Sequence, residues 1–343
     1  MSAARGRVAA VYGASGHTGK FVVRELARRG LGVVLVGRDP GRLRAIEAAQ
    51  EHEVRVAAID APAALDRALA GVDIVINCAG PFLDTAPALI EAALRSRASY
   101  VDTTAEQGAA RAAFEQYDAA AREAGVVVLP AAAFFGALGD LLATAALSAW
   151  ASAEAIEIAI ALDSWQPTLG TRRTGERNTA RRLVVTGGKL DFLPAHLPEQ
   201  DWDFAEPFGR QAVMALPFSE TILMAQHLKA EEIRCFINTK PIAELRDART
   251  PSPAPSDASG RSAQVFLMEA RVHRGGEARR AIATGRDIYA ISAPIAVEAV
   301  ERILDGRVSS AGALAAGAAF DARDFLAALG REHLSVEYAE ARV

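Results

Sequence analysis

The sequence predicts an α/β fold in which a doubly wound parallel sheet is followed by a second, α+β domain built on a mostly antiparallel sheet. Up to Leu129, short apolar runs alternate with helical patterns, as in successive βα units. Farther along, strand-like runs follow one another without regular helical crossovers. The 343 residues also exceed the size at which one hydrophobic core usually keeps growing. We therefore predict a first domain at 1–130, a second at 131–291, and C-terminal helices at 292–343 that return to the first.

The first predicted strand leads directly into a glycine-rich turn and a helix. Residues 8–20 read VAAVYGASGHTGK, with three glycines at a spacing of three. Gly13 permits the tight turn, Gly16 lets the backbone approach a pyrophosphate, and Gly19 allows the helix to lie close to the strand. This pattern is typical of a Rossmann-type dinucleotide site at a helix N-terminus, although a turn that serves packing alone is the alternative. The predicted cofactor contacts here are Gly13, Ser15, Gly16, His17, Thr18 and Gly19.

The end of the second predicted strand indicates which dinucleotide binds. The run LGVVLVGRD places Arg38 where an enzyme specific for NAD has an Asp or Glu on the ribose 2′-hydroxyl. A guanidinium suits a 2′-phosphate, and Arg42 follows one helical turn later as a second donor. The sequence therefore predicts NADP. In the alternative, Arg38 is a solvated charge and Asp39 binds the ribose.

Two further strand ends carry predicted cofactor contacts. Asp60 follows a strand predicted at 54–59, where it can accept a hydrogen bond from the adenine amino group or cap the next helix. The strand predicted at 73–78 ends in small residues and Gly-Pro, which exposes backbone groups at the carboxyl edge of the sheet, where ligands bind in open α/β folds. The residues assigned to the cofactor there are Asn77, Ala79, Gly80 and Pro81. The first domain is completed by helices predicted at 40–50, 61–70, 85–97 and 111–124 and strands at 99–102 and 126–129.

The second domain has the features of an antiparallel sheet. Strand-like runs occur at 155–162, 211–216, 231–238, 263–273 and 278–291. The sequence RGGE predicts a hairpin between the last two, and residues 250–260 are expected to form a surface loop. The apolar stretch 129–150 is predicted to be a buried connecting helix and not a membrane span, because Asp140 lies at its centre.

The amino-acid composition argues against several classes of binding partner. The net charge of −4, with no basic block interleaved with aromatics, argues against nucleic acid. Two distant cysteines indicate a reducing compartment without a disulfide framework, and six scattered histidines suggest no metal site. No signal peptide precedes the first strand, so we expect a cytoplasmic protein that does not bind membranes.

Several motifs together resemble those of the saccharopine dehydrogenase-like oxidoreductases, particularly short bacterial members near the trans-acting enoyl reductases. They are GASGHTG, VGRD, NCAGPF, YVDTTAE, FFGALGDLLA, RDIYAISAP and AFDARDFLAAL, which span the whole chain. The resemblance implies the fold and a nicotinamide cofactor. It does not identify the substrate, because the family includes enzymes that act on amino acids, imines and enoyl groups. Ala105 stands where relatives often have Gly, and Phe134-Phe135-Gly136 where they often have Gly-Phe-Asp, which removes a carboxylate from the domain junction.

Hydride transfer to a C=N, C=C or C=O bond often needs a proton donor beside the nicotinamide. Asp102 and Glu106 follow the strand at 99–102, and Tyr289 lies at the end of the last predicted strand of the second domain. We assign these three as candidate catalytic residues. In the alternatives, Asp102 anchors a loop and Tyr289 is a core ring with a satisfied hydroxyl. No Tyr-x-x-x-Lys pair of short-chain reductases occurs at the expected place.

The segment 170–182 contains five arginines and is expected to be helical from Thr174. Such a cluster can clamp a carboxylate or phosphate, or form a solvated face with ion pairs. The chain as a whole is predicted to be an NADP-dependent oxidoreductase acting on a small-molecule substrate. The alternatives are a non-catalytic NADP(H)-binding regulatory protein and a scaffold with an empty nucleotide site. The long strands of the second domain, assigned to substrate binding and dimerisation, favour a homodimer.

Overall fold

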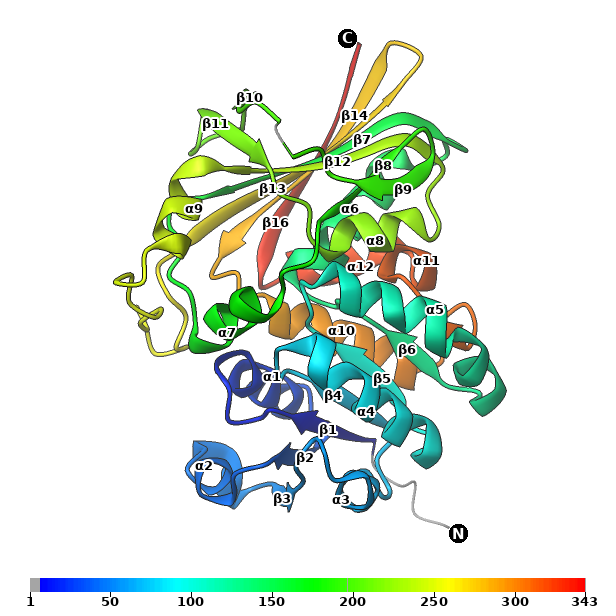
Figure 1. The fold of residues 1–343 in the computed structure, drawn as a ribbon, viewed down its shortest axis with the longest axis vertical. Helices are drawn as coiled ribbons and strands as arrows, with labels where there is room; N and C mark the ends of the chain where they lie inside the picture. Colours follow the sequence, from blue (N-terminus) through cyan, green and yellow to red (C-terminus); the bar gives the residue numbers. More distant parts are fainter. Residues whose placement is uncertain (1–6, 196, 343) are drawn as a thin grey trace.

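The structure is a computed structural model that describes residues 7–195 and 197–342, and within them the chain forms two sheets (Figure 1). The first sheet is parallel throughout, in the order β15-β6-β5-β4-β1-β2-β3. Its strand order reverses beside β1, which is the crevice of a doubly wound fold. The predicted fold class is confirmed. The strands are β1 Val8–Tyr12, β2 Gly32–Gly37, β3 Glu53–Val56, β4 Ile74–Asn77, β5 Ser99–Asp102, β6 Val127–Leu129 and β15 Gly312–Ala313.

Helices cover both faces of this sheet because its strands are apolar on both sides. In β1, Ala9 and Val11 join the core under α1 and α10, whereas Ala10 and Tyr12 join the core under α3, α4 and α5. The helices are α1 His17–Arg28, α2 Pro40–Arg44, α3 Pro62–Ala68, α4 Phe82–Ser96, α5 Gln107–Ala124 and α10 Ser292–Leu304. The helix predicted at 40–50 is interrupted: α2 ends at Arg44, and a 3-10 turn follows at Glu47–Gln50.

The second sheet follows the order β10-β11-β12-β7-β13-β14-β16. Only β7 and β12 pair in parallel among these neighbours in the described chain. The predicted hairpin is confirmed: Arg274 pairs with Glu277 across Gly275 and Gly276, which have φ of 59° and 76°. The strands are β7 Ala153–Leu162, β10 Gln200–Asp203, β11 Arg210–Ala215, β12 Ala230–Asn238, β13 Val265–Arg274, β14 Glu277–Arg286 and β16 Leu334–Arg342, with β8 Leu183–Thr186 and β9 Lys189–Phe192 beside β12.

The connecting helix is shorter than predicted. Only α6, Gly139–Leu147, is a regular α-helix, and it packs against β13 and β14. It is preceded by an irregular turn at Phe134–Leu138, in which Gly136 has a φ of 143° and a Cβ would lie 2.5 Å from the Ala131 carbonyl oxygen. Asp140 is buried and accepts hydrogen bonds from the Gly317 N–H and the His227 ring. No helix among the described residues is long and apolar enough to cross a membrane.

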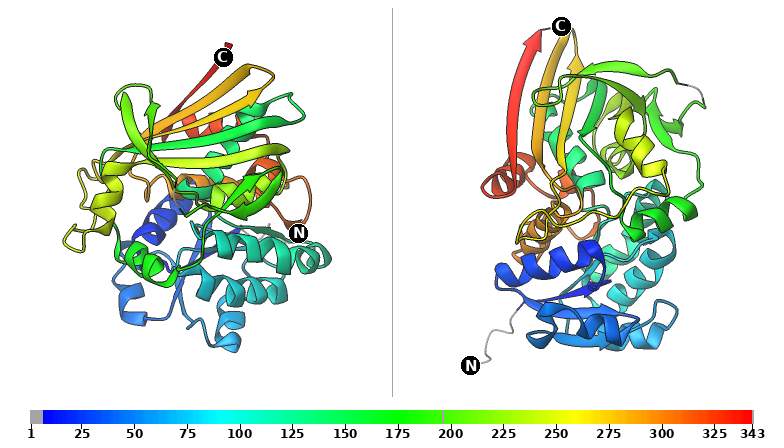
Figure 2. Two further views of the ribbon diagram at one scale, coloured as in Figure 1. Left: turned by 45° about the horizontal axis from the view of Figure 1, so that its top comes forward. Right: turned by 90° about the vertical axis from the view of Figure 1, so that its left-hand side faces the viewer.

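The C-terminal segment also differs from the prediction. α10 does pack against α1, and β15 extends the first sheet. However, the prediction of helices to the end of the chain is wrong, because β16 pairs with β14 along nine residues at the outer side of the second sheet (Figure 2). Apolar Leu334, Val336 and Tyr338 alternate in the sequence with polar Ser335 and Glu337, which is a strand pattern that the expectation of helices overlooked. Short helices complete the chain: α7 Leu169–Arg177, α8 Ser219–Ala225, α9 Thr239–Arg246, α11 Ala316–Ala319 and α12 Ala322–Gly330.

The strand predicted at 278–291 ends at Arg286, so Tyr289 lies in a turn before α10 and not on a strand. Asp287 causes this turn: its φ is 61°, and its carboxylate accepts hydrogen bonds from the backbone N–H groups of Tyr289 and Ala290. The segment 250–260 has no regular structure and is largely exposed, as predicted.

Candidate functional site

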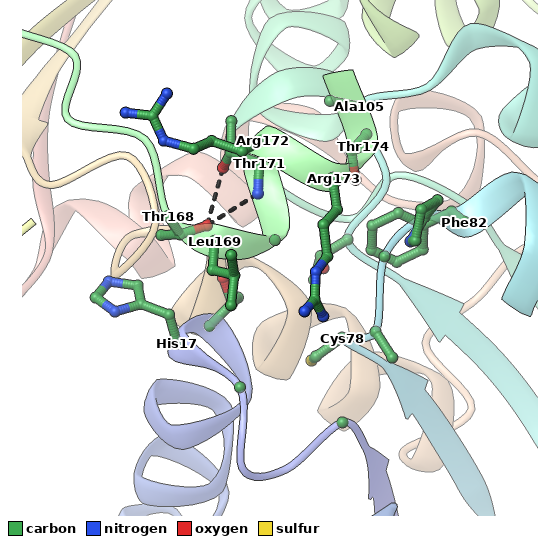
Figure 3. A pocket seen from close by; sticks show the side chains of 18 of the residues that line it. His17, Cys78, Phe82, Ala105, Thr168, Leu169, Thr171, Arg172, Arg173 and Thr174 are labelled. Atoms are coloured by element: carbon green, nitrogen blue, oxygen red, sulfur yellow. Dashed lines mark hydrogen bonds between the residues drawn. The ribbon is translucent and has the colours of Figure 1, made fainter. Parts of the chain in front are cut away.

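A cleft of about 1310 Å³ separates the two sheets. One wall is the carboxyl edge of the first sheet, and the opposite wall comes from α7 and the segments around Trp165 and Phe218. In Figure 1, α7 lies between the two lobes above α1, and Figure 3 shows the cleft from close by. Because the cleft contains the crevice at which the strand order reverses, it is the place where an α/β fold binds its ligand.

The glycine-rich turn forms the floor of the cleft, and its glycines are sterically required. Gly13 has a φ of 81°. A Cβ on Gly19 would lie 2.2 Å from the Gly13 carbonyl oxygen, and one on Gly16 would lie 3.1 Å from it. Gly19 therefore allows α1 to pack on the strand, whereas the other predicted residues of the turn, Gly13, Ser15, Gly16, His17 and Thr18, line the cleft.

The start of α1 fits a diphosphate. Its N-cap is Gly16, which has no side chain to accept hydrogen bonds from the first turn. The N–H groups of a first helical turn lack intrahelical partners, and the helix dipole adds a partial positive charge. These groups and the hydroxyls of Ser15 and Thr18 can therefore hold phosphate oxygens.

Arg38 and Arg42 both line the cleft at the end of β2, and both are exposed. The Asp39 carboxylate is already hydrogen-bonded to the backbone of its own helix. Its Oδ1 atom accepts hydrogen bonds from the N–H groups of Gly41 at 2.9 Å and Arg42 at 3.0 Å, so it caps α2. This geometry favours Arg38, and not Asp39, as the group that meets the ribose.

Asp60 and Asn77 do not line the cleft. Asp60 is exposed, and the N-cap of α3 is Ala61, which has no side-chain cap. Asn77 is fully buried: its amide donates to Thr85 Oγ1 and to the Tyr100 hydroxyl, and its Oδ1 atom accepts from the Ala79 N–H. Asn77 therefore shapes the loop whose residues Ala79, Gly80 and Pro81 do line the cleft.

Asp102 is buried behind the cleft and does not line it. Its Oδ1 atom accepts hydrogen bonds from the N–H groups of Thr104 at 2.9 Å and Ala131 at 2.8 Å, and its Oδ2 atom accepts from the Tyr100 hydroxyl. Burial raises the pKa of Asp102 to about 6. These contacts match the loop anchor that was the alternative for this residue.

Glu106 lines the cleft, but its carboxylate is held by backbone. Oε1 accepts from the Phe82 N–H at 2.7 Å and Oε2 from the Leu83 N–H at 3.2 Å, so Glu106 caps the start of α4. Burial raises its pKa. Glu106 thus remains within reach of a ligand while serving as a structural cap.

Tyr289 lines the cleft at the centre of a hydrogen-bond network. Its hydroxyl accepts from Trp165 Nε1 at 3.0 Å and from the Thr168 N–H at 3.4 Å, and it lies 3.0 Å from Thr171 Oγ1. Its ring meets the His17 ring edge to face at the start of α1. Burial raises the pKa of the Tyr289 hydroxyl, so it is protonated at neutral pH. Of the candidate catalytic residues, Tyr289 is therefore best placed to give a proton to a ligand in the cleft.

The arginine-rich segment forms α7, which begins at Leu169 and not at Thr174 as predicted. Thr168 caps it by accepting a hydrogen bond from the Thr171 N–H (Figure 3). Arg177 pairs with Asp84 of α4 at 2.9 Å. Thr174 lies close to Gly80 on the opposite wall of the cleft: a Cβ on Gly80 would lie 2.8 Å from the Thr174 Oγ1 atom. α7 therefore bridges the cleft from the second domain to the first.

The arginines of this segment have different roles. Arg172 donates to the Thr250 carbonyl oxygen, and the Arg181 guanidinium lies over the Phe192 ring. Arg173 is exposed and points from α7 toward Cys78 across the cleft (Figure 3). Arg182 also lines the cleft. The ion pair of Arg177 fits the alternative of a solvated face, while Arg173 and Arg182 remain available to an anion.

An aromatic group in the cleft was not predicted from the sequence. Phe135 stacks on Trp165 with ring centroids 5.2 Å apart and packs against Phe218 at 4.3 Å. All three line the cleft. They come from three separate segments of the chain, so no spacing or motif connects them. The hydrophobic residues of FFGALGD, which include Phe135, were the one sequence feature that could have indicated this group.

Comparison with known proteins finds similarity over the first domain. The family model for the saccharopine dehydrogenase NADP binding domain matches residues 9–129. Curated relatives match the same share of the chain, 38% in each case. A lipid droplet localized protein of Caenorhabditis elegans is 31% identical over 144 residues, which is 34% of that protein. A trans-acting enoyl reductase of Mycobacterium ulcerans is 28% identical over 138 residues, 33% of that protein. A saccharopine dehydrogenase-like oxidoreductase of Bos taurus is 28% identical over 150 residues, 35% of that protein.

These matches span about a third of the length of the curated relatives. The fold of the whole chain resembles that of apo saccharopine dehydrogenase (L-Glu forming) from Saccharomyces cerevisiae. The TM-score is 0.68 over 97% of this chain and 100% of that chain, at 12% identity, so this likeness concerns the fold alone. The resemblance and the NADP cofactor that the sequence predicts are confirmed. Over residues 9–129 the chain is similar to the saccharopine dehydrogenase NADP binding domain.

Proposed function

We propose that the protein is an NADP-dependent oxidoreductase that transfers hydride between NADPH and a C=N, C=C or C=O bond of a small metabolite. The observation that carries the proposal is one continuous cleft. It joins the glycine turn and Arg38 to an aromatic compartment, formed by Phe135, Trp165 and Phe218, and Tyr289 also lines it. A protein that only senses NADPH needs the first part of this cleft but not the second. The names of the relatives, which include oxidoreductases and an enoyl reductase, support the same class.

In this proposal the cofactor supplies the hydride and the chain supplies position and a proton. The turn at Gly13 to Thr18 holds the diphosphate, and Arg38 holds the 2′-phosphate. The loop Ala79 to Pro81 supports the nicotinamide end at the carboxyl edge of the sheet. Phe135 and Trp165 exclude water from the reacting bond, which strengthens electrostatic interactions within the site.

Tyr289 is the proposed proton donor. Because Trp165 and Thr168 both donate to its hydroxyl oxygen, the hydroxyl proton is directed to Thr171 or to a ligand. The raised pKa keeps that proton in place at neutral pH until substrate accepts it.

Oxidation of NADPH by purified protein, followed at 340 nm in the presence of pooled carbonyl, imine and enoyl metabolites, tests the proposal. We expect at least one pool to support repeated turnover. Tight NADPH binding without turnover in any pool would instead favour the non-catalytic regulatory protein.

A further inference from the structure

Arg182 is a partly buried cation in the cleft wall that lacks a carboxylate partner. Within residues 7–195 and 197–342, its guanidinium makes one hydrogen bond, from Nη1 to the Pro217 carbonyl oxygen at 2.6 Å. A guanidinium has five N–H donors, so most of its donor capacity remains free. No carboxylate of the described chain lies within ion-pair distance of it. Other arginines of the same segment do have partners or lie in solvent, as Arg177 and Arg173 show.

One buried acidic group, Glu220, acts electrostatically on this cation. Glu220 contributes to the electrostatics of Arg182, but it is fully buried, and burial raises its pKa. Its Oε1 atom already accepts from the Phe218 N–H. Burial also lowers the pKa of Arg182, and the charge of Glu220 opposes this effect. A buried cation without an anion is costly, so a bound anion would stabilise this wall of the cleft.

Arg182 also adjoins the aromatic compartment directly. Its guanidinium lies 4.7 Å from the centroid of the Phe218 ring, and Phe218 packs on Phe135, which stacks on Trp165. An anion bound by Arg182 would therefore have the rest of its molecule against these three rings. The rings favour an apolar or aromatic body over a polar one.

We infer that the substrate of this site carries a carboxylate on an apolar or aromatic body, with Arg182 binding the carboxylate and Phe135, Trp165 and Phe218 packing on the body. The inference rests on the proposed function, since it names the substrate class of the same cleft. It assigns Arg182 as a specificity-determining residue and gives it no part in the chemical step.

Binding of three probes to the full chain, saturated with NADP⁺, tests this inference. The probes are 3-phenylpropionate, its uncharged amide 3-phenylpropionamide, and acetate. Tryptophan fluorescence gives the affinities, because Trp165 lies in the compartment. We expect 3-phenylpropionate to bind about 10–100-fold more tightly than the amide, since a charge-assisted hydrogen bond is lost in the amide. Acetate should bind weakly because it has no body to pack on the rings.

Arg182→Met should lower 3-phenylpropionate affinity to that of the amide, without changing amide or NADPH binding. Arg182→Lys keeps the charge and should retain part of the preference. Arg181→Met is the matched control, because the neighbouring arginine lies outside the cleft over Phe192, and it should behave as the wild type.

Three results would overturn the inference: no binding of 3-phenylpropionate, equal binding of acid and amide, or an acid preference that survives Arg182→Met. NADPH affinity, measured on the same protein preparations before NADP⁺ is added, separates this failure from failure of the proposed function. If NADPH binds and an uncharged substrate oxidises it, the oxidoreductase proposal stands and the carboxylate inference alone falls.

Discussion

At the scale of single residues, hydrogen-bond partners decide which polar groups can act on a ligand. Asp102 ends β5 and Glu106 follows it, and the sequence alone does not distinguish their roles. The structure distinguishes their roles, because Asp102 accepts a hydrogen bond from the N–H of Ala131, a residue far along the chain. Glu106 instead reaches the cleft. Such a long-range contact leaves no local pattern, so the predicted role of Asp102 depended on information that the sequence near it does not contain.

The pH dependence of stability should reveal the buried state of Asp102. Its pKa rises from an ordinary value of 3.8 to about 6 in the folded protein. The folded state therefore holds this proton more tightly, and the stabilisation is complete below about pH 4 and lost as the pH rises through about 6. Asp102→Asn cannot titrate. The free energy of unfolding of the wild type minus that of the variant should fall by up to about 3 kcal/mol from pH 4 to pH 7. Urea unfolding at both pH values measures it, and a constant difference would contradict the burial of this carboxyl group.

Removal of the Tyr289 hydroxyl should slow the chemical step. Because this hydroxyl is protonated and faces the cleft, Tyr289→Phe should lower single-turnover NADPH oxidation by about 10²–10⁴-fold with NADPH affinity unchanged. Asp102→Asn serves as the control and should keep the wild-type rate. Glu106→Gln should stay within a few-fold of that rate, since both carboxylate oxygens are bound by backbone N–H groups. A full rate in Tyr289→Phe and a large loss in Glu106→Gln would reverse the assignment of the donor.

At the scale of elements, α7 is the bridge between the domains and has little intrinsic stability. None of its residues is buried, whereas most of α10 is. It is held by its Thr168 cap, by Tyr289 and by the Arg177–Asp84 ion pair, and exposed ion pairs contribute at most about 1 kcal/mol. The basic composition of this segment was visible in the sequence. Its position across the cleft was not, because it depends on contacts with α4 and with the turn before α10.

Hydrogen exchange should report this difference. We expect backbone amides of α7 to exchange much faster than those of α10, and to slow when NADPH binds beneath them. The amides of α12, which lies away from the cleft, should not respond to NADPH. Protection of α7 that is the same with and without NADPH would mean that the helix does not contact the bound cofactor.

At the scale of the whole molecule, local patterns predicted the first domain better than the site between the domains. The βα alternation and glycine turn are encoded within short stretches, so the parallel sheet and its cofactor edge could be derived from sequence. The compartment of Phe135, Trp165 and Phe218 could not, because the second sheet brings together segments that are distant in sequence. The C-terminal strand β16 was missed for a different reason: its local alternation of apolar and polar residues was present in the sequence but was overlooked.

The outer edge of the second sheet is relevant to the oligomeric state of the protein. β16 is an outer strand whose far edge has no partner strand among the described residues. Unpaired edges of long strands favour pairing with a second copy. We expect a homodimer, and sedimentation equilibrium at micromolar concentration should give twice the mass of the chain. A monomer under those conditions would contradict this expectation.

Parallel titrations with NADPH and NADH test whether the cleft binds NADPH through the glycine turn and Arg38. The wild type should bind NADPH more tightly. Arg38→Ala should weaken NADPH binding by roughly 1.5–3 kcal/mol, the value of a charged hydrogen bond, while NADH binding stays unchanged. Gly16→Val should abolish both, because a side chain would occupy the place of the pyrophosphate. Equal affinity of the wild type for the two cofactors, or an unaltered NADPH affinity in Arg38→Ala, would contradict the account.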